Sequence, residues 1–105
     1  MPTAFNDVYT LDFSDTETFR WSKLDMGDQP APPPRARHTA TVIGEGKILV
    51  FGGLDRRKRY SDVWVLDTMQ KTWTCVVPEG KAPSPRAHHS ATLVDNVLWV
   101  LGGYR

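Results

Sequence analysis

Short, fully apolar runs separated by polar turns dominate the chain. The clearest are ILVF (48–51), VWVL (63–66) and VLWVL (97–101). Runs of this length, apolar at successive positions, are typical of β-strands that are covered on both faces. No segment shows a helical period of apolar positions, and the eight prolines lie among the strand signals. The pattern predicts an all-β fold.

The chain also repeats itself. PRARHTATVIGEGKILVFGG (34–53) aligns with PRAHHSATLVDNVLWVLGG (85–103), and NDVYTLD (6–12) aligns with SDVWVLD (61–67). The distance from one GG pair to the next gives a period of about 50 residues. A period of this size indicates one supersecondary unit per repeat, stacked on its neighbours.

The sequence pattern of each repeat predicts four short strands. In the complete copy they cover residues 38–43, 47–51, 62–67 and 71–77, and GEG at 44–46 signals a tight hairpin between the first two. A four-stranded antiparallel sheet that recurs every 50 residues or so and is covered by its neighbours is a propeller blade.

The order of motifs resembles the kelch repeat: PRxxH, an apolar strand, GG, then D-V-W/Y-x-L-D and a Trp. The resemblance implies four-stranded antiparallel blades of a β-propeller. Residues 1–24 would supply the third and fourth strands of one blade, 25–36 a Pro-rich connector, 37–77 a complete blade, and 78–105 the first and second strands of the next.

One intact blade and two half-blades form only a partial propeller. Rings typically close with roughly four or more blades, because an open ring leaves strand edges unpaired. Two explanations remain open: the chain is a fragment of a longer propeller, or the half-blades of different copies complete one another. Since each chain holds two blades' worth of strands, the second would give a homotrimer with a six-bladed ring.

Residues at matched positions of the repeats are expected to be structural. The glycines would allow positive φ or tight backbone packing, and the aromatic residues, together with Trp99, would form the inter-blade core. For the arginines we expect a role in tying a connector to the neighbouring blade, and for the histidines packing or capping. The set is Gly52, Gly53, Gly102, Gly103, Trp21, Trp73, Tyr9, Trp64, Arg35, Arg86, His38 and His89.

Composition argues against several classes of function. Of 105 residues, 40% are hydrophobic, and thirteen basic residues nearly balance twelve acidic ones, which argues against a nucleic-acid binder. No run approaches the length of a membrane span, and the first ten residues lack the features of a signal peptide. A single cysteine fits a reducing compartment. We expect a cytoplasmic protein, with cytoskeletal association as one option.

The loop LDRRKRY (54–60) concentrates four cations in this nearly neutral chain. Antiparallel strand order places it on the same face as the connectors before each blade and the C-terminal residues. Arginine clusters on rigid scaffolds recognise carboxylates, and in kelch propellers, by resemblance, this face receives partner peptides. The expected binding residues for an acidic peptide or loop are Arg56, Arg57, Lys58, Arg59, Tyr60, Arg37, His88 and Arg105. The alternative is a solvated turn that maintains solubility.

Catalytic and metal-binding signals are weak. His38 and His89 are repeat-equivalent and lie in different blades, while His88 and His89 point to opposite faces of a strand. Cys75 has no histidine near it in sequence. We therefore expect no catalytic residue, metal or cofactor. Some kelch-like propellers are copper oxidases or iron-dependent enzymes, so a propeller enzyme whose site residues lie outside this segment is the alternative. The prolines at 32–34 indicate a stiff connector or a polyproline ligand.

Overall fold

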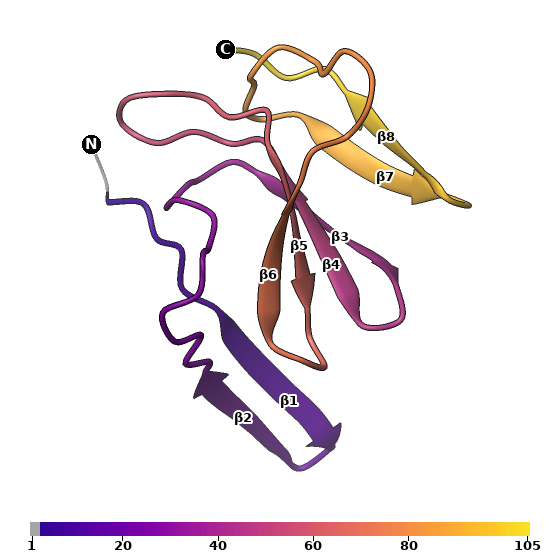
Figure 1. Ribbon diagram of the computed structural model, residues 1–105. Helices are drawn as coiled ribbons and strands as arrows, with labels where there is room; N and C mark the ends of the chain where they lie inside the picture. The colour runs from indigo at the N-terminus through magenta and orange to yellow at the C-terminus, as the bar shows by residue number, and fades with distance from the viewer. Residues whose placement is uncertain (1–2) are drawn as a thin grey trace.

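Eight β-strands in three antiparallel sheets form the computed structural model, which describes residues 3–105 (Figure 1). The first two residues of the predicted segment 1–24 lie outside the described residues. Within 3–105 there is no helix long and apolar enough to span a bilayer. The predicted all-β fold of antiparallel blades is confirmed.

The central sheet is one complete blade. It contains β3 (Thr39–Gly44), β4 (Lys47–Phe51), β5 (Val63–Asp67) and β6 (Thr72–Val76), hydrogen-bonded in that order. These bounds agree with the strands expected from the apolar runs to within one residue at each end. Trp64 of β5 and Trp73 of β6 meet edge to face, with ring centroids 6.3 Å apart, an arrangement that stabilises aromatic pairs.

Two-stranded sheets flank this blade on either side. The first contains β1 (Tyr9–Asp15) and β2 (Thr18–Lys23), and the second contains β7 (Ser90–Val94) and β8 (Val97–Leu101). Their strands pair in the same register as the equivalent strands of the complete blade. In the first, Leu11 pairs with Trp21 as Leu66 pairs with Trp73. Likewise Ala91 pairs with Val100 as Ala40 pairs with Val50. The flanking sheets therefore have the geometry of a blade's outer and inner halves, respectively.

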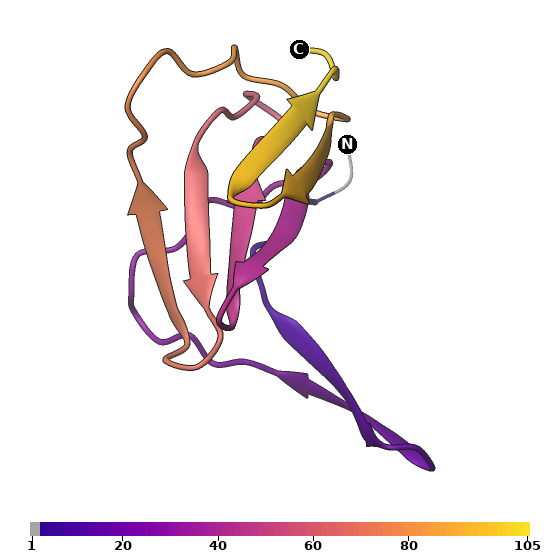
Figure 2. The ribbon, with the colours of Figure 1, turned by 90° about the vertical axis from the view of Figure 1, so that its right-hand side faces the viewer.

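Neighbouring blades meet along their first strands and their connectors. β3 contacts β7, as Figure 2 shows. Each connector is also hydrogen-bonded to the blade before it: the Arg35 N–H donates to the Phe5 carbonyl (3.2 Å), and the Arg86 N–H donates to the Tyr60 carbonyl (3.1 Å). The repeated bond fixes the position of each new blade on the last.

Most buried side chains lie in the complete blade and at its junction with β7. The buried apolar side chains are Val50, Phe51, Tyr60, Trp64, Leu66 and Ala87. His89 is buried at the same junction, where its Nε2 lies 3.1 Å from the Phe51 carbonyl and 3.0 Å from Thr39 Oγ1. The packing of one blade against the next is therefore complete only at this interface.

Several aromatic positions expected in the core are exposed. Tyr9 is 54%, Trp21 68% and Trp99 54% accessible, so the prediction of burial is wrong for them in this chain. The reason is that β1–β2 and β8 each lack the other half of their blade within residues 3–105. Trp64, at the position of Tyr9 but in the complete blade, is buried.

The two glycines after β4 are needed both for their positive φ angles and because neighbouring atoms leave no room for a side chain. Gly52 and Gly53 have φ of 73° and 102°, in the region that side chains rarely adopt. A Cβ on Gly52 would lie 2.6 Å from His89 Cε1, and one on Gly53 would lie 2.8 Å from the Ala36 carbonyl oxygen. These glycines let the blade ends approach each other closely.

Candidate protein-binding face

The connectors and the basic loop meet at one end of the molecule. In Figure 1 the loop between β4 and β5, the connector leading into β7 and the C-terminal residues all lie at the top, while the hairpin turns β1–β2, β3–β4 and β5–β6 lie at the bottom. This is the arrangement expected from antiparallel order, and it separates the cationic loop from most of the acidic turns.

Asp55 organises the basic loop from within. Its Oδ1 accepts hydrogen bonds from the N–H groups of Arg57 (2.8 Å) and Lys58 (2.9 Å), and its Oδ2 accepts one from the Tyr60 hydroxyl (2.6 Å). These bonds, led by the one from Tyr60, lower the pKa of Asp55 to about 2. The carboxylate thus stays ionised and holds a tight turn from which Arg56 and Arg57 extend into solvent.

Tyr60 is a structural residue of this loop, which corrects its assignment as a partner-contacting residue. Its side chain is buried, its ring lies 4.0 Å from the Arg35 guanidinium carbon, and its hydroxyl is bound by Asp55. Burial, and then the bond to Asp55, raises the pKa of Tyr60 to about 12. The sequence analysis missed this role because Tyr60 directly follows four cations. The available signal was Asp55, since an Asp side chain commonly accepts a hydrogen bond from the backbone two residues further on and so forms a turn.

Arg35 holds the connector to its own blade. Its guanidinium forms two hydrogen bonds with the Asp62 carboxylate (2.6 and 3.0 Å) and one with the Gly52 carbonyl (3.1 Å). Burial alone would raise the pKa of Asp62, but hydrogen bonds from Arg35 and the Trp64 indole keep it below its ordinary value. Arg35 is therefore structural, as expected, but the prediction that it ties the connector to the neighbouring blade is wrong: its partners belong to the blade that the connector leads into.

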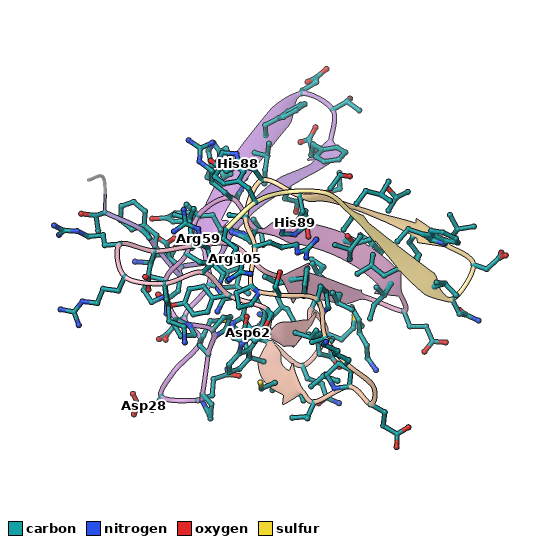
Figure 3. The ribbon with its side chains drawn as sticks, turned by 90° about the horizontal axis from the view of Figure 1, so that it is seen from above. Asp28, Arg59, Asp62, His88, His89 and Arg105 are labelled. Carbon is teal, nitrogen blue, oxygen red and sulfur yellow. The ribbon has the colours of Figure 1, made fainter. Side chains whose placement is uncertain are left out.

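Arg37 and His88 occupy the variable position just after these connectors. Both have φ of 60°, and the His88 N–H donates to the Arg37 carbonyl (3.2 Å). The His88 ring stacks on Tyr104, with centroids 4.8 Å apart and planes 13° from parallel. Partial desolvation, and then the charges of Arg37 and Arg59, lower the pKa of His88. Figure 3 looks down on this end and labels Arg59, His88 and Arg105 there.

Apart from Arg35, the cations at this end form no direct ion pair with a carboxylate of the described residues, and Asp55 acts on Lys58 only at longer range. Among residues 3–105 the one ion pair within 4.0 Å is Arg35–Asp62. The basic face is defined here as the expected binding residues other than Tyr60: Arg37, Arg56, Arg57, Lys58, Arg59, His88 and Arg105. Such a surface favours anions, since nothing in the described chain competes for these groups within ion-pair distance.

The other histidines and the cysteine lie elsewhere. His89 is buried between blades, and desolvation lowers the pKa of both His38 and His89. Cys75 is exposed on β6. Within the described part of the chain, no three His, Cys, Asp or Glu side chains converge as metal ligands would.

Comparison with known proteins identifies the repeat. A family profile described as the KLHDC2/KLHL20/DRC7 Kelch-repeats domain matches residues 2–105. The chain belongs to the kelch-repeat family. A solved structure titled "Structure of YjhT" superposes with a TM-score of 0.73 over 93% of this chain and 28% of that one. At 23% identity, this match shows the shared fold alone.

Curated relatives contain this kelch segment within much longer chains. The flagellar outer-arm dynein alpha chain of Chlamydomonas reinhardtii is 48% identical over 96% of this chain, which spans 2% of its length. Acyl-CoA-binding domain-containing protein 5 of Arabidopsis thaliana is 34% identical over 96% of this chain, or 15% of its own length. Host cell factor of Drosophila melanogaster is 33% identical over 99% of this chain, or 7% of its own length.

Proposed function

We propose that this kelch segment is a non-catalytic interaction module whose basic face binds an acidic segment of another protein. The observation that carries the proposal is the set of cations without an ion-pair partner among residues 3–105, four of them on a loop that Asp55 holds by hydrogen bonds. Arginine binds carboxylates through paired hydrogen bonds, and a preorganised loop loses little entropy on binding. Membership of the kelch family supports a role in protein interaction.

The test is a calorimetric titration with a peptide of alternating glutamate and glycine. Arg56→Glu combined with Arg57→Glu should weaken binding by about tenfold or more, since reversal replaces attraction by repulsion. Lys47→Glu with Arg20→Glu, exposed cations outside the basic face, should leave the affinity unchanged. Binding that survives the loop reversal, or that is insensitive to salt, contradicts the proposal.

We also propose that the half-blades of separate copies complete one another. Asp7 occupies the repeat position of Asp62, and Arg86 that of Arg35, yet no carboxylate within 3–105 lies within 4.0 Å of Arg86. In the completed blade, β8 of one copy would lie beside β1 of a second copy, as β4 lies beside β5. The β4–β5 register then pairs Leu98 with the second copy's Leu11, and Val100 with its Tyr9. The same alignment brings Arg86 toward the second copy's Asp7.

Light scattering tests this assembly. We expect a mass of three chains for the 105-residue chain, because three copies close a six-bladed ring. Arg86→Asp should dissociate it, and Arg86→Asp combined with Asp7→Arg should restore it. A folded monomer, or a double variant no better than the single one, contradicts self-completion and favours a fragment of a longer propeller.

We propose a cytoplasmic setting with cytoskeletal association. The single cysteine is compatible with a reducing compartment, and the relative with 48% identity is a flagellar dynein chain. A fluorescent fusion that co-localises with microtubule structures would support this setting, whereas a secreted or membrane-bound fusion would contradict it.

A further inference from the structure

An open pocket lies at the edge of the basic face, between the first half-blade and the complete blade. Its volume is about 460 Å³, within the size range of ligand sites. The residues that line it are Thr3, Ala4, Ala36, Arg37, Leu54, Asp55 and Arg56. The floor is rigid because Ala36 and Leu54 exchange two backbone hydrogen bonds, each 2.8 Å long.

The next groove along the chain offers an internal comparison. There Ala87 and Tyr104 exchange the same pair of backbone hydrogen bonds (2.9 and 3.0 Å), so Tyr104 replaces Leu54. By repeat alignment, Arg59 replaces Ala4 and His88 replaces Arg37. The Tyr104 ring stacks on His88 at this place. Two of the three positions thus carry larger side chains in the second groove, Arg59 and Tyr104, whereas Ala4 and Leu54 line the first one.

The chemistry of the pocket has two parts. Ala4, Ala36 and Leu54 contribute apolar groups, and Arg37 and Arg56 contribute cations that have no ion-pair partner in residues 3–105. Asp55 also lines the pocket, but its carboxylate oxygens are bound to Tyr60 and to the loop backbone. The pocket therefore suits an uncharged side chain whose neighbours along a peptide are acidic.

We propose that this pocket binds an aliphatic side chain of the acidic partner segment, with carboxylates on either side of that side chain bound by Arg37 and Arg56. The inference rests on the proposed function and adds its specificity: charge brings the segment to the basic face, and the pocket selects its sequence. Burial of a leucine-sized side chain should give roughly tenfold discrimination or more over a peptide that lacks it.

Two peptides of sequence EDLDE and EDGDE, blocked at both ends, test the pocket on the 105-residue chain. The leucine peptide should bind about tenfold more tightly to the wild type. Leu54→Tyr, which copies the residue found at position 104, should remove this preference while leaving charge-dependent binding of both peptides. Tyr104→Leu, the matched change in the second groove, should keep the preference.

The outcomes separate the two proposals. Equal binding of both peptides to the wild type overturns the pocket and leaves the basic face intact, as does a preference that survives Leu54→Tyr. Absence of binding by either peptide at low salt overturns both. An independent check that needs no variant is a nuclear Overhauser effect between the peptide's leucine methyls and those of Leu54 and Ala36. Its absence at saturation also contradicts the pocket.

Discussion

Arg35 and Arg86 occupy the same position in two repeats but have different surroundings. The Arg35 side chain is 3% exposed and bound by Asp62. Arg86 is only half-buried and bonds to the Gly102 carbonyl (3.0 Å) and to Ser84. Equivalent positions thus make the same hydrogen bond to a glycine carbonyl. How much that arginine stabilises the fold depends on whether the rest of its blade is present.

Removing the Asp62 carboxylate should destabilise the fold strongly. Asp62→Ala leaves the buried Arg35 guanidinium without its counter-charge, and we expect a loss of roughly 3 kcal/mol in the free energy of unfolding, measured with urea. Asp28→Ala removes an exposed carboxylate outside both the basic face and the proposed contact between copies, and should cost less than about 0.5 kcal/mol. Similar costs for the two variants would contradict the assigned role of Arg35.

Tyr60 gives a pH-dependent signature. Its pKa is about 12 in the folded state and close to 10 when unfolded. The resulting stabilisation is fully present below pH 10 and is lost as the pH rises through 12, because the unfolded chain gives up the proton first. The difference in tyrosinate absorbance between wild type and Tyr60→Phe should have a midpoint near 12. A midpoint near 10 would show that the hydroxyl is free.

For single residues, the sequence predicts the structural role better than the degree of exposure. The repeat alignment identified Arg35 and the double glycine as structural, and the contacts of Arg35 agree with that role. It could not reveal that Tyr60 is buried, since that depends on a hydrogen bond to Asp55 and on a ring contact with Arg35 across the loop.

Strands were the most predictable elements. The apolar runs and turn residues gave the four strands of the complete blade to within one residue at each end, because periodicity and turn chemistry are local properties. Burial was less predictable: β8 was expected to be covered on both faces, and Tyr9 of β1 and Trp21 of β2 were expected in the core, but these strands are largely exposed. Their cover belongs to other half-blades, which no local pattern in this chain supplies.

The loop between β4 and β5 depends on Gly53 for more than its positive φ. Gly53→Ala would place a Cβ 2.8 Å from the Ala36 carbonyl oxygen, so we expect a loss of roughly 3 kcal/mol or more in unfolding free energy. Gly80→Ala has a similar φ of 92° but open space around the Cβ, and should cost only about 1 kcal/mol. Equal losses of unfolding free energy in the two variants would mean that backbone strain alone, and not the close contact, destabilises Gly53→Ala.

The whole molecule separates its charges by end. The basic face lies with the connectors, whereas the hairpin turns, away from that face, carry six of the twelve acidic residues: Asp12, Asp15, Glu17, Glu45, Asp67 and Asp95. A net charge of +1 conceals this polarity. Antiparallel strand order alone predicted which end each loop occupies. The open pocket was not predictable, because it depends on how side chains of two blades fill the groove between them.

Mapping of amide chemical shifts tests most directly whether this face is the binding surface. The ¹⁵N-labelled chain would be titrated with the glutamate–glycine peptide at low salt. We expect concentration-dependent shifts at the basic face, led by the amides of residues 54–59 with Arg37 and His88, and none at the turns of the opposite end. Shifts concentrated at the opposite end, or no shifts at a peptide excess that saturates a millimolar site, would contradict the proposed function.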